Sequence, residues 1–590
     1  MKNLIKQLKD IYIKILCNNN KKKKKNNINI LYNNYKDNNI YGDINININS
    51  IFFLNKENKK KIGIKLGNKI KKKLNKYVYK YNFKSNYLNI FLKKRYYIKI
   101  IKNYIKFNTF LKKQSSNKRY IIEFSSPNSN KPLHLGHLRN ILIGNTIANI
   151  YKVLGFNIIK SQLINDRGIH ICKSIIALKY FFNKKNLKFN IKGDHFVGIL
   201  YFKFEKELKK EIKLISKKYN IKKKEAIKYS KLSNLVNKEL INWEKKKKES
   251  IYIWKKINKL VYKGFNITYK KLNIKFDEIL YESKTYLLGK KFILKGIERN
   301  IFFIDKDKSV YFLYNKKKII LLRNNGTSLY ITQEIGTLLY RIKKYKNFNL
   351  LIYVVGNEQI NHFKVLFEIL KNNKLLIYKN LYHLSYNTVN FLGKKIKSRY
   401  INKNKYIFID DLISFMNNYV KNKIKKKKID KIVELISLGA IKYQFIKINP
   451  KKIIDFNINN VLRIKGNTGI YIQYTYARIY SILKKKNIKK IKFYEIKFLK
   501  LIKKNEISII RLILEYETII DRILKKYDPS ILTNYIYFIS KKINNFYQKN
   551  KILNINNIYK QNLRLIICKI ILNFLYFNMK ILGIPILKKI

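Results

Sequence analysis

The chain has 590 residues, which is too long for one hydrophobic core and predicts roughly three or four domains. Its formal net charge of +96, from 130 Lys and Arg against 34 Asp and Glu, predicts an anionic partner, with nucleic acid ahead of an acidic membrane surface. A hydrophobic content of 46% favours a folded chain over a disordered one, and three widely spaced cysteines, with no C-x-x-C pair, support neither a disulfide framework nor a zinc ribbon.

Part of the positive charge has a simpler origin than binding. Lysine, asparagine, isoleucine and tyrosine are abundant and share AT-rich codons, so base composition contributes to runs such as Lys21–Lys25 and Lys425–Lys428, which we expect to be solvated surface. No uncharged apolar run reaches the length of a membrane span, and the closest one, Leu565–Ile590, is interrupted by Lys569 and Lys580. We therefore expect a cytoplasmic protein that does not act at a membrane.

Residues 1–112 show a mixed pattern of apolar and polar positions and no cluster that suggests catalysis. A Lys- and Ser-rich stretch, Lys112–Lys118, is typical of a linker and predicts a domain boundary near residue 113. The sequence therefore predicts a first α+β domain at 1–112.

The next stretch predicts a strand, a polar loop and the start of a helix. Apolar residues at Tyr120–Ile122 precede the loop, and apolar residues recur at helical spacing from Ile141. A helix N-terminus offers free N–H groups and a positive dipole end to phosphate. His134 and His137, three apart, can donate to the same phosphate oxygens, and Gly136 lets a flat ring lie on bare backbone. Taken alone, this pattern also fits a capped helix start in a basic protein.

The longer string from Glu123 to Asn140 closely resembles the HIGH-motif region of class I aminoacyl-tRNA synthetases, in the version found in arginyl-tRNA synthetases. The resemblance implies an α/β fold class, with a Rossmann-like nucleotide-binding catalytic domain of the HIGH type at 113–409. It also implies a connecting helical segment at 410–465 and an all-α anticodon-binding bundle at 466–590. In this family the extra N-terminal domain contacts the tRNA.

The segments after the motif also fit this family. Alternating apolar and helical stretches from Val153 suggest a doubly wound parallel sheet, in which ligands bind beyond the carboxyl ends of the strands. The run Asn165–Gly168 matches the N-D-x-G turn of the family, and Lys192–Gly198 is a second similar patch. The basic helical pattern around 203–259 predicts an insertion, whose simplest interpretation is a surface helical hairpin without chemistry.

An arginine pocket is the next implication of the resemblance. The positions that match arginine-binding residues of the family are Ser126, Asn128, Glu282, Tyr330, Glu334 and Gln359. A guanidinium needs a planar carboxylate partner, and acidic residues are scarce in this chain. Taken singly, Glu282 or Glu334 would be interpreted as one partner of a surface or structural ion pair, but two carboxylates at matching positions favour a pocket. The family usually has aspartate where this chain has Glu334, so the pocket must accommodate one more methylene.

The stretch Lys394–Arg399 resembles the second class I signature, the KMSKS loop, which neutralises the leaving pyrophosphate. The resemblance implies that the catalytic residues are His134, His137, Lys131, Lys395, Lys397 and Arg399. It implies that ATP is bound by His134, Gly136, His137, Lys395 and Ser398. Relatives commonly have Glu-Gly where this chain has Tyr400 and Ile401, so we expect slower closure of the loop.

Near the C-terminus, the run Gly466–Ile479 resembles the start of the anticodon-binding bundle of the family. The predicted tRNA-binding residues are Tyr471, Tyr474, Tyr476 and Arg478. Tyrosines on a basic helical surface can stack on unpaired bases. For some of these tyrosines the alternative is a place in the core of the bundle.

The resemblance covers residues 120–590 and implies an arginine–tRNA ligase. Its substrates would be arginine, ATP with Mg²⁺ and tRNA(Arg), with no metal held by the protein itself, and we expect a monomer. Two alternatives stay open: a small-molecule nucleotidyltransferase of the same superfamily, and a tRNA-binding protein without catalysis. The helical C-terminal part argues against the first, and the intact histidine motif argues against the second.

Overall fold

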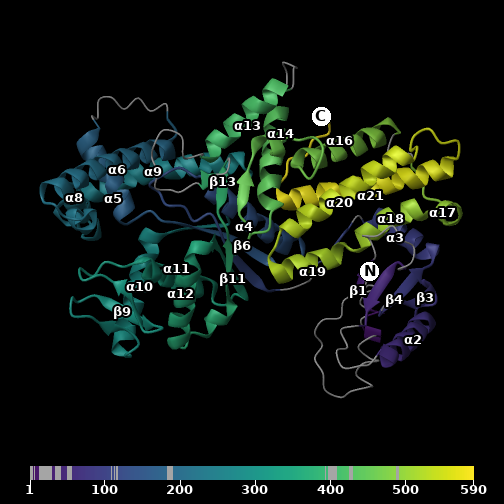
Figure 1. Ribbon diagram of the computed structural model, residues 1–590, viewed down its shortest axis with the longest axis horizontal. Helices are drawn as coiled ribbons and strands as arrows, with labels where there is room; N and C mark the ends of the chain where they lie inside the picture. The colour runs from purple at the N-terminus through teal and green to yellow at the C-terminus, as the bar shows by residue number, and fades with distance from the viewer. Residues whose placement is uncertain are drawn as a thin grey trace. The chain divides into compact units, whose positions relative to one another are not determined.

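The computed structural model forms two compact units (Figure 1). The central unit is Gln114–Leu462, and the terminal unit combines Met1–Lys113 with Arg463–Ile590. The residues that the structure describes are 4, 7–8, 10–11, 30–32, 42–48, 56–84, 86–107, 109–111, 113, 117–182, 191–391, 394–395, 408–423, 430–486 and 491–589. The division into four domains that the sequence suggests stays a prediction.

The central unit is built on a five-stranded sheet with strand order β12-β11-β5-β6-β7. Its strands are β5 (Arg119–Glu123), β6 (Asn157–Ile164), β7 (Glu278–Tyr281), β11 (Leu350–Gly356) and β12 (Leu381–Tyr386). All four pairings are parallel, which confirms the predicted parallel sheet. The chain runs outward from β5 to β7 on one side and from β11 to β12 on the other, so the order reverses beside β5. Ligands bind at such a reversal, beyond the carboxyl ends of the strands.

Helices connect these strands. Helices α4 (Leu135–Val153), α5 (Ile169–Phe181), α10 (Glu282–Glu298) and α12 (Ile360–Asn372) follow strands of the sheet, and α11 (Tyr330–Tyr345) precedes β11. The chain reaches α11 through the small antiparallel sheet of β8 (Phe303–Ile304), β9 (Val310–Tyr314) and β10 (Lys317–Leu322). One hydrophobic core contains residues of this small sheet, α11, β11 and α12. Its members include Phe302, Leu338, Tyr353 and Phe363. Ile331 and Ile335 of this core lie in the first turns of α11, beside the predicted carboxylate Glu334.

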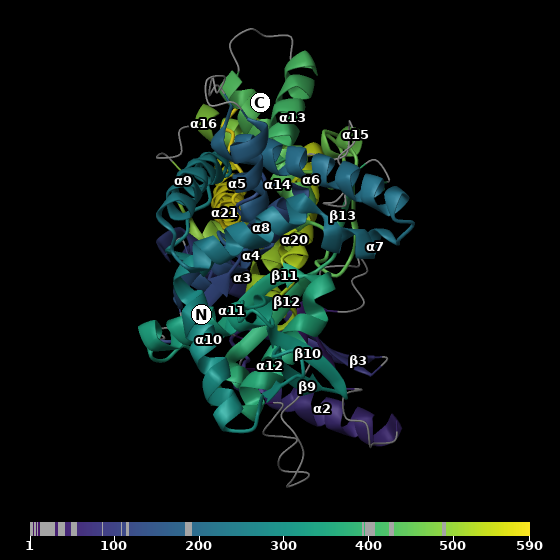
Figure 2. The ribbon, with the colours of Figure 1, turned by 90° about the vertical axis from the view of Figure 1, so that its left-hand side faces the viewer.

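Within the described residues, a set of inserted helices follows α5 between β6 and β7. They are α6 (Gly193–Lys218), α7 (Lys223–Ala226), α8 (Lys231–Glu244) and α9 (Lys248–Lys271), and Figure 2 shows α6, α8 and α9 beside α5. The helices therefore extend past the predicted range 203–259 at both ends. The first turns of α6 lack the basic pattern on which the predicted range rests, because apolar residues are buried there: Phe196, Val197 and Leu200.

The described residues in the last part of the central unit form a three-stranded sheet and helices. The strands are β13 (Val389–Phe391), β14 (Lys394–Lys395) and β15 (Ile454–Phe456), and the helices are α13 (Ile409–Lys423), α14 (Asp430–Ile446) and α15 (Ile458–Val461). The start of α13 lies against the loop before α4, because Ile409 N donates to Leu133 O at 2.9 Å.

The terminal unit combines a small α+β part with a helical bundle. The α+β part has the antiparallel sheet β1 (Ile30–Tyr32), β2 (Ile44–Asn47), β4 (Tyr87–Leu92) and β3 (Val78–Lys84), with helices α2 (Lys56–Lys73) and α3 (Lys94–Phe107). The bundle contains α16 (Gly469–Lys485), α17 (Glu495–Leu501), α18 (Lys504–Leu514), α19 (Tyr516–Lys526), α20 (Ser530–Lys549) and α21 (Ile558–Leu582). Phe110, which follows α3, packs edge-on against Phe574 of α21 at 5.2 Å between ring centroids.

Helix α21 is long and apolar enough to cross a membrane by length and composition. However, 72% of its most apolar window is buried inside the protein, where the helix packs against α16, α17 and α18. This burial is typical of the central helix of a bundle.

Arg139 of α4 is fully buried and fastens this helix to the segments that flank β13 and β15. Its guanidinium donates to five carbonyl oxygens, those of Asn387, Thr388, Asn449, Pro450 and Lys452, at 2.7 to 3.1 Å. Burial lowers its pKa to about 10, so it stays charged at neutral pH. Arg139 therefore links the helix of the histidine motif to the sheet that carries Lys394 and Lys395.

We predict that Arg139→Met destabilises the protein by at least about 2 kcal/mol, because each buried carbonyl left without a donor costs roughly 1–3 kcal/mol. Arg139→Lys should recover only part of this loss, since an ammonium has fewer donors than a planar guanidinium and a different geometry. Denaturant unfolding of the two variants and the wild type measures the effect. Equal midpoints for all three proteins would show that the five hydrogen bonds contribute nothing to stability.

Candidate active site

The loop after β5 has a strained backbone at its first two residues. Ser125 and Ser126 have φ angles of 73° and 38°, which non-glycine residues rarely adopt. Asn140 of α4 holds this turn by accepting a hydrogen bond from Ser125 N at 2.5 Å, and Tyr269 of α9 contacts Ser125 Oγ at 2.6 Å. Strain that is held in this way by the surrounding structure is typical of functional sites.

The two histidines of the motif lie at the start of α4 with their rings 3.9 Å apart. His134 Nδ1 accepts from Gly136 N, and His137 Nδ1 accepts from His134 N, each at 3.1 Å. Because both Nδ1 atoms accept from backbone N–H groups, each neutral ring carries its proton on Nε2. Burial, followed by the charge of Lys131, lowers the pKa of His137 to about 3, and burial also lowers the pKa of His134. At neutral pH the pair is therefore two uncharged donors at a helix N-terminus.

The predicted pocket carboxylates come from the first turns of two helices that pack closely. Glu282 is the first residue of α10 and is 3% exposed, and Glu334 lies one turn into α11, after Tyr330. Gly289 of α10 and Gly336 of α11 permit the approach, because a Cβ on either glycine would overlap the backbone of the other helix. The structure thus brings Glu282, Tyr330 and Glu334 together.

The electrostatics of this pocket favour a cationic ligand. Burial raises the pKa of Glu282 to about 8, and burial together with the charge of Glu123 raises that of Glu334 to about 8. One oxygen of Glu334, Oε2, is buried and accepts no hydrogen bond from the part of the chain that the structure describes. A buried carboxylate without such a partner is costly, and a guanidinium would supply the missing donors.

A small pocket beside these residues contains two of the predicted arginine-binding positions. It is lined by Asn128, Ser129, Asn130, Asn165, Arg167, His170, Ile171 and Tyr330. Asn128 Oδ1 accepts from Asn165 Nδ2 at 3.0 Å, which ties the loop after β5 to the N-D-x-G turn after β6. Ser126 lies on the same loop and donates to Glu123 Oε1 at 3.2 Å.

A buried ion pair of α11 with the end of β5 was not predicted from any motif. Arg341 of α11 is fully buried and binds Glu123 Oε2 at 2.6 Å, and it also donates to Ser161 Oγ at 2.9 Å. The charge of Glu123 raises the pKa of Glu334, while the charge of Arg341 lowers it. Two sequence signals could have drawn attention to this pair: acidic residues are scarce, and arginine is much rarer than lysine.

Asp166 shows how the inserted helices support the pocket. Its side chain accepts hydrogen bonds from Ser283 N at 2.9 Å, Ser283 Oγ at 2.7 Å and Tyr262 OH at 3.0 Å. Its backbone oxygen accepts from Trp254 Nε1 at 2.6 Å. Since Ser283 follows Glu282, helix α9 helps to fix the position of a pocket carboxylate, which is more than a surface hairpin would do.

Comparisons with known proteins agree with this geometry. The family model for the catalytic domain of class I (R) tRNA synthetases matches residues 100–459, and the model for the DALR anticodon binding domain matches residues 472–590. The chain belongs to the class I arginyl-tRNA synthetase family. This membership confirms the fold class that the motifs imply, a class I catalytic domain followed by a helical anticodon-binding domain.

Known arginyl-tRNA synthetases match most of the chain. It is 36% identical over 515 residues to the arginine–tRNA ligase of Flavobacterium psychrophilum, which covers 85% of this chain and 84% of that protein. It is 40% identical over 454 residues to the arginine–tRNA ligase of Treponema denticola, with 74% and 73% covered. The arginyl-tRNA synthetases of Thermus thermophilus and Plasmodium falciparum share the fold, with TM-scores of 0.79 and 0.77 at 19% and 22% identity, and with 99% or more of both chains covered in each comparison.

Some of the predicted site residues are not brought to the pocket. Others lie outside the part of the chain that the structure describes. Gln359, in the short 3-10 helix η4 (Asn357–Gln359), is exposed, and it makes no hydrogen bond to the pocket within the described residues. The backbone of Lys395 lies in β14, paired with Asn390. Outside the described residues lie Lys397, Ser398, Arg399, Tyr400 and Ile401. The predictions for all of these residues stay predictions.

The four predicted tRNA-binding residues of the arginyl-tRNA synthetase motif all lie on α16. Tyr474 is 38% exposed, whereas Tyr476 is 5% exposed and so occupies the kind of core position that the sequence left open. Tyr471 packs edge-on against Tyr537, and the guanidinium of Arg478 lies 4.0 Å from the ring centroid of Tyr547. Among the tyrosines, Tyr474 is therefore the most accessible to RNA.

Proposed function

We propose that this chain ligates arginine to tRNA in two steps. In the first step, a carboxylate oxygen of arginine attacks the α-phosphorus of ATP, and the bond to pyrophosphate breaks to give arginyl-adenylate. In the second step, a terminal ribose hydroxyl of the tRNA attacks the arginyl carbonyl carbon, and AMP leaves. The observation that carries the proposal is the pairing of the buried Glu282, at the start of α10, with Glu334 in α11, of which one carboxylate oxygen is buried, together with two neutral histidine donors at the start of α4.

The ATP site would use the loop before α4. The Nε2–H groups of His134 and His137 donate to phosphate oxygens without bringing a charge of their own, and Lys131 supplies the positive charge. Gly136 leaves room for the flat adenine ring. From the family resemblance, Lys395, Lys397, Ser398 and Arg399 cover the departing pyrophosphate, and Mg²⁺ arrives bound to ATP.

The arginine site would bind the guanidinium at one end of its substrate and the α-amino and carboxylate groups at the other. Glu282 and Glu334 bind the guanidinium, with Tyr330 beside them in the first turn of α11. Ser126 and Asn128, on the loop after β5, face the α-amino and carboxylate ends. Gln359 completes the set, since η4 follows β11, the strand next to β5. This orientation directs the carboxylate of the substrate arginine toward the ATP phosphates and away from Glu282 and Glu334.

The positive charge of the chain suits a tRNA substrate, and we propose that it works in the cytoplasm as a monomer, away from membranes. The anticodon would be bound by the bundle of the terminal unit, through Tyr474, Tyr471 and Arg478 on α16. Tyr476 would support this surface from within the bundle.

We predict that Tyr474→Ala raises the KM for tRNA by roughly 5- to 100-fold, because stacking of a base on an aromatic ring contributes about 1–3 kcal/mol. The KM for arginine should not change. Tyr382 of β12 is a matched control, since it is 37% exposed but lies in the central unit. A lower melting temperature with an unchanged KM for tRNA would assign Tyr474 to packing instead.

Arginine-dependent exchange of labelled pyrophosphate into ATP tests the proposed function. Exchange should occur with arginine and should fail with lysine or glutamine, and we expect it to need tRNA, as it generally does in this family. A small-molecule nucleotidyltransferase would exchange without any response to tRNA. A tRNA-binding protein without catalysis would show no exchange with any amino acid, so either outcome would exclude the ligase.

A further inference from the structure

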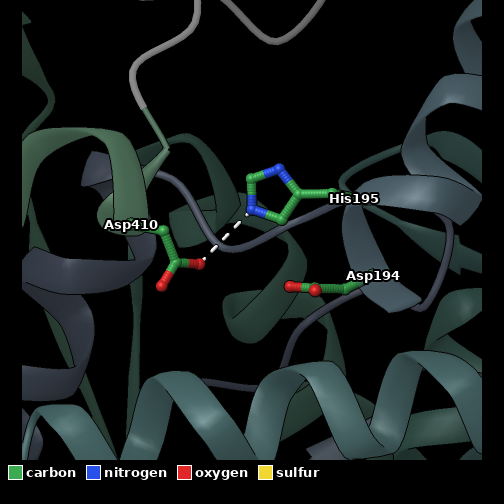
Figure 3. Close-up of side chains that lie close together, drawn as sticks. All are labelled: Asp194, His195 and Asp410. Atoms are coloured by element: carbon green, nitrogen blue, oxygen red, sulfur yellow. Dashed lines mark hydrogen bonds and ion pairs between the residues drawn. The ribbon is translucent and has the colours of Figure 1, made fainter. Parts of the chain in front are cut away.

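A cluster of charged side chains joins the start of α6 to the start of α13 (Figure 3). Lys192 Nζ lies 2.7 Å from Asp410 Oδ2 and 3.1 Å from Asp194 Oδ2, and it donates to Thr268 Oγ1 at 2.5 Å. His195 Nε2 lies 3.3 Å from Asp410 Oδ2. The cluster therefore connects the inserted helices α6 and α9 with the first turn of α13.

Asp194, His195 and Asp410 offer ligand atoms within 4.8 Å of one another, which is the spacing of a metal site. Lys192, however, places its ammonium at hydrogen-bonding distance from both carboxylates. Burial would raise the pKa of Asp410, but the hydrogen bonds from His195 and Lys192 outweigh burial and hold the pKa below its ordinary value. The side chain of Lys192 thus already supplies the cation that a metal would supply, and the cluster is an ion-pair anchor.

The anchor holds a short segment, Phe408–Asp410, against the loop that precedes α4 and carries His134. Ile409 N donates to Leu133 O at 2.9 Å, and Phe408 forms an antiparallel bridge with His134. The ring of Phe408 also packs edge-on against the ring of His195 at 5.2 Å between centroids. The residues beside Asp410 therefore touch both α6 and the loop of the first histidine.

Helix α6 holds the same loop from a second side. A Cβ on Gly198 would lie 2.7 Å from Pro132 Cδ, so the bare backbone of α6 is packed against the loop. The N-terminal end of α6 is seated on α9 in the same manner, because a Cβ on Gly264 would overlap the carboxylate of Asp194. The loop is thus enclosed by α6 and by Phe408–Ile409, and the ion pair of Lys192 with Asp410 joins these two supports.

We propose that Asp410 and Lys192 are positioning residues for the ATP step. They touch neither substrate; their ion pair clamps α6 and α13 around the loop that carries Lys131 and His134, and so sets the distance of these groups from the phosphates. The inference rests on the proposed function, because it assigns those groups to ATP. A shift of about 1 Å in a positioned group can slow a reaction roughly 100-fold.

The proposal predicts a selective effect of Asp410→Asn and Lys192→Met. Both variants should raise the KM for ATP and slow arginyl-adenylate formation, measured by rapid quench with tRNA present, by roughly 10- to 100-fold. The dissociation constant for arginine, measured by calorimetry without ATP, should stay within about twofold. Lys192→Arg keeps the charge and should restore most of the rate. Glu207→Gln removes a carboxylate from surface ion pairs on the same helix and should change neither constant.

Three results would overturn the proposal. A lower melting temperature of Asp410→Asn with an unchanged KM for ATP would make the cluster purely structural. Equal losses of ATP and arginine binding would point to general disruption of the unit. Tight binding of Zn²⁺ or Mn²⁺ to the wild type that is lost in His195→Ala would make the cluster a metal site. Failure of the proposed function looks different, because the wild type itself would then show no exchange with arginine.

Discussion

Replacing Glu282 by glutamine should lower kcat/KM for arginine by roughly 10²–10⁴. A guanidinium that is buried without its carboxylate partner loses about 3–5 kcal/mol, and each 1.36 kcal/mol corresponds to a factor of ten in rate. Glu334→Gln should have a similar effect, since one of its oxygens is buried and accepts no hydrogen bond from the described part of the chain. Steady-state pyrophosphate exchange at varied arginine measures both changes.

Glu334→Asp is the matched control for this prediction, because aspartate is the residue that the family usually has at this position. This variant keeps the charge and should stay within about tenfold of the wild type. Full activity of Glu282→Gln at low arginine concentration would show that the guanidinium is bound elsewhere. Robust exchange of Glu282→Gln with glutamine or lysine would show that the pocket was never specific for arginine.

The raised pKa values of the two carboxyl groups predict a dependence of arginine binding on pH. Glu282 has a pKa of about 8 in the free pocket, so it is mostly protonated at pH 7 and must release its proton when a guanidinium binds. The affinity for arginine should therefore rise as the pH increases from 6 to 9. Calorimetry in buffers of different ionisation enthalpy measures the protons released. No release at pH 7 would mean that the carboxyl groups are already charged without substrate.

His134→Ala and His137→Ala should each slow arginine activation by roughly 10²–10³, the usual loss when one transition-state hydrogen-bond donor is removed. Both rings are neutral donors, because burial lowers their pKa values well below 7. Their contribution should therefore be constant between pH 6 and 9, unlike that of the carboxylates. Pre-steady-state formation of the adenylate separates this effect from product release.

A histidine outside the loop provides the control. His383 of β12 stacks on Phe363 and contacts Val355 O at 3.2 Å, so His383→Gln should alter stability more than the rate of activation. The loop variants should show the opposite pattern. If His137→Ala unfolds the protein while the folded fraction keeps its full activity, the pair serves only as a helix cap.

The local elements of the site could be predicted from the sequence. The apolar run at Tyr120–Ile122 lies within β5, and a helix follows the polar loop, as the change from strand-like to helical spacing predicts. The helix begins at Leu135, ahead of Ile141, where the apolar spacing becomes helical, so its first residue was not predicted. The guanidinium pocket is different, since Glu282 and Glu334 lie far apart in the chain. Their meeting depends on backbone contacts at Gly289 and Gly336, which no periodicity reveals, so only the resemblance pointed to them.

Interactions between distant segments could not be predicted. Arg341 with Glu123, and Arg139 with its five carbonyl oxygens, depend on how strands and helices far apart in sequence come together. The folding of the N-terminal and C-terminal parts into one unit likewise leaves no local signal. Tyr476 is buried whereas Tyr474 is exposed, although the two tyrosines are only two residues apart on α16.

Charging of a total tRNA pool with labelled amino acids tests the central claim most directly. The proposal predicts that this chain transfers arginine to tRNA in the presence of ATP and Mg²⁺, that it does not transfer lysine or glutamine, and that Glu282→Gln lowers the yield at limiting arginine. Transfer of a different amino acid by the wild type, or no transfer of arginine by a folded preparation that binds tRNA, would contradict the proposal.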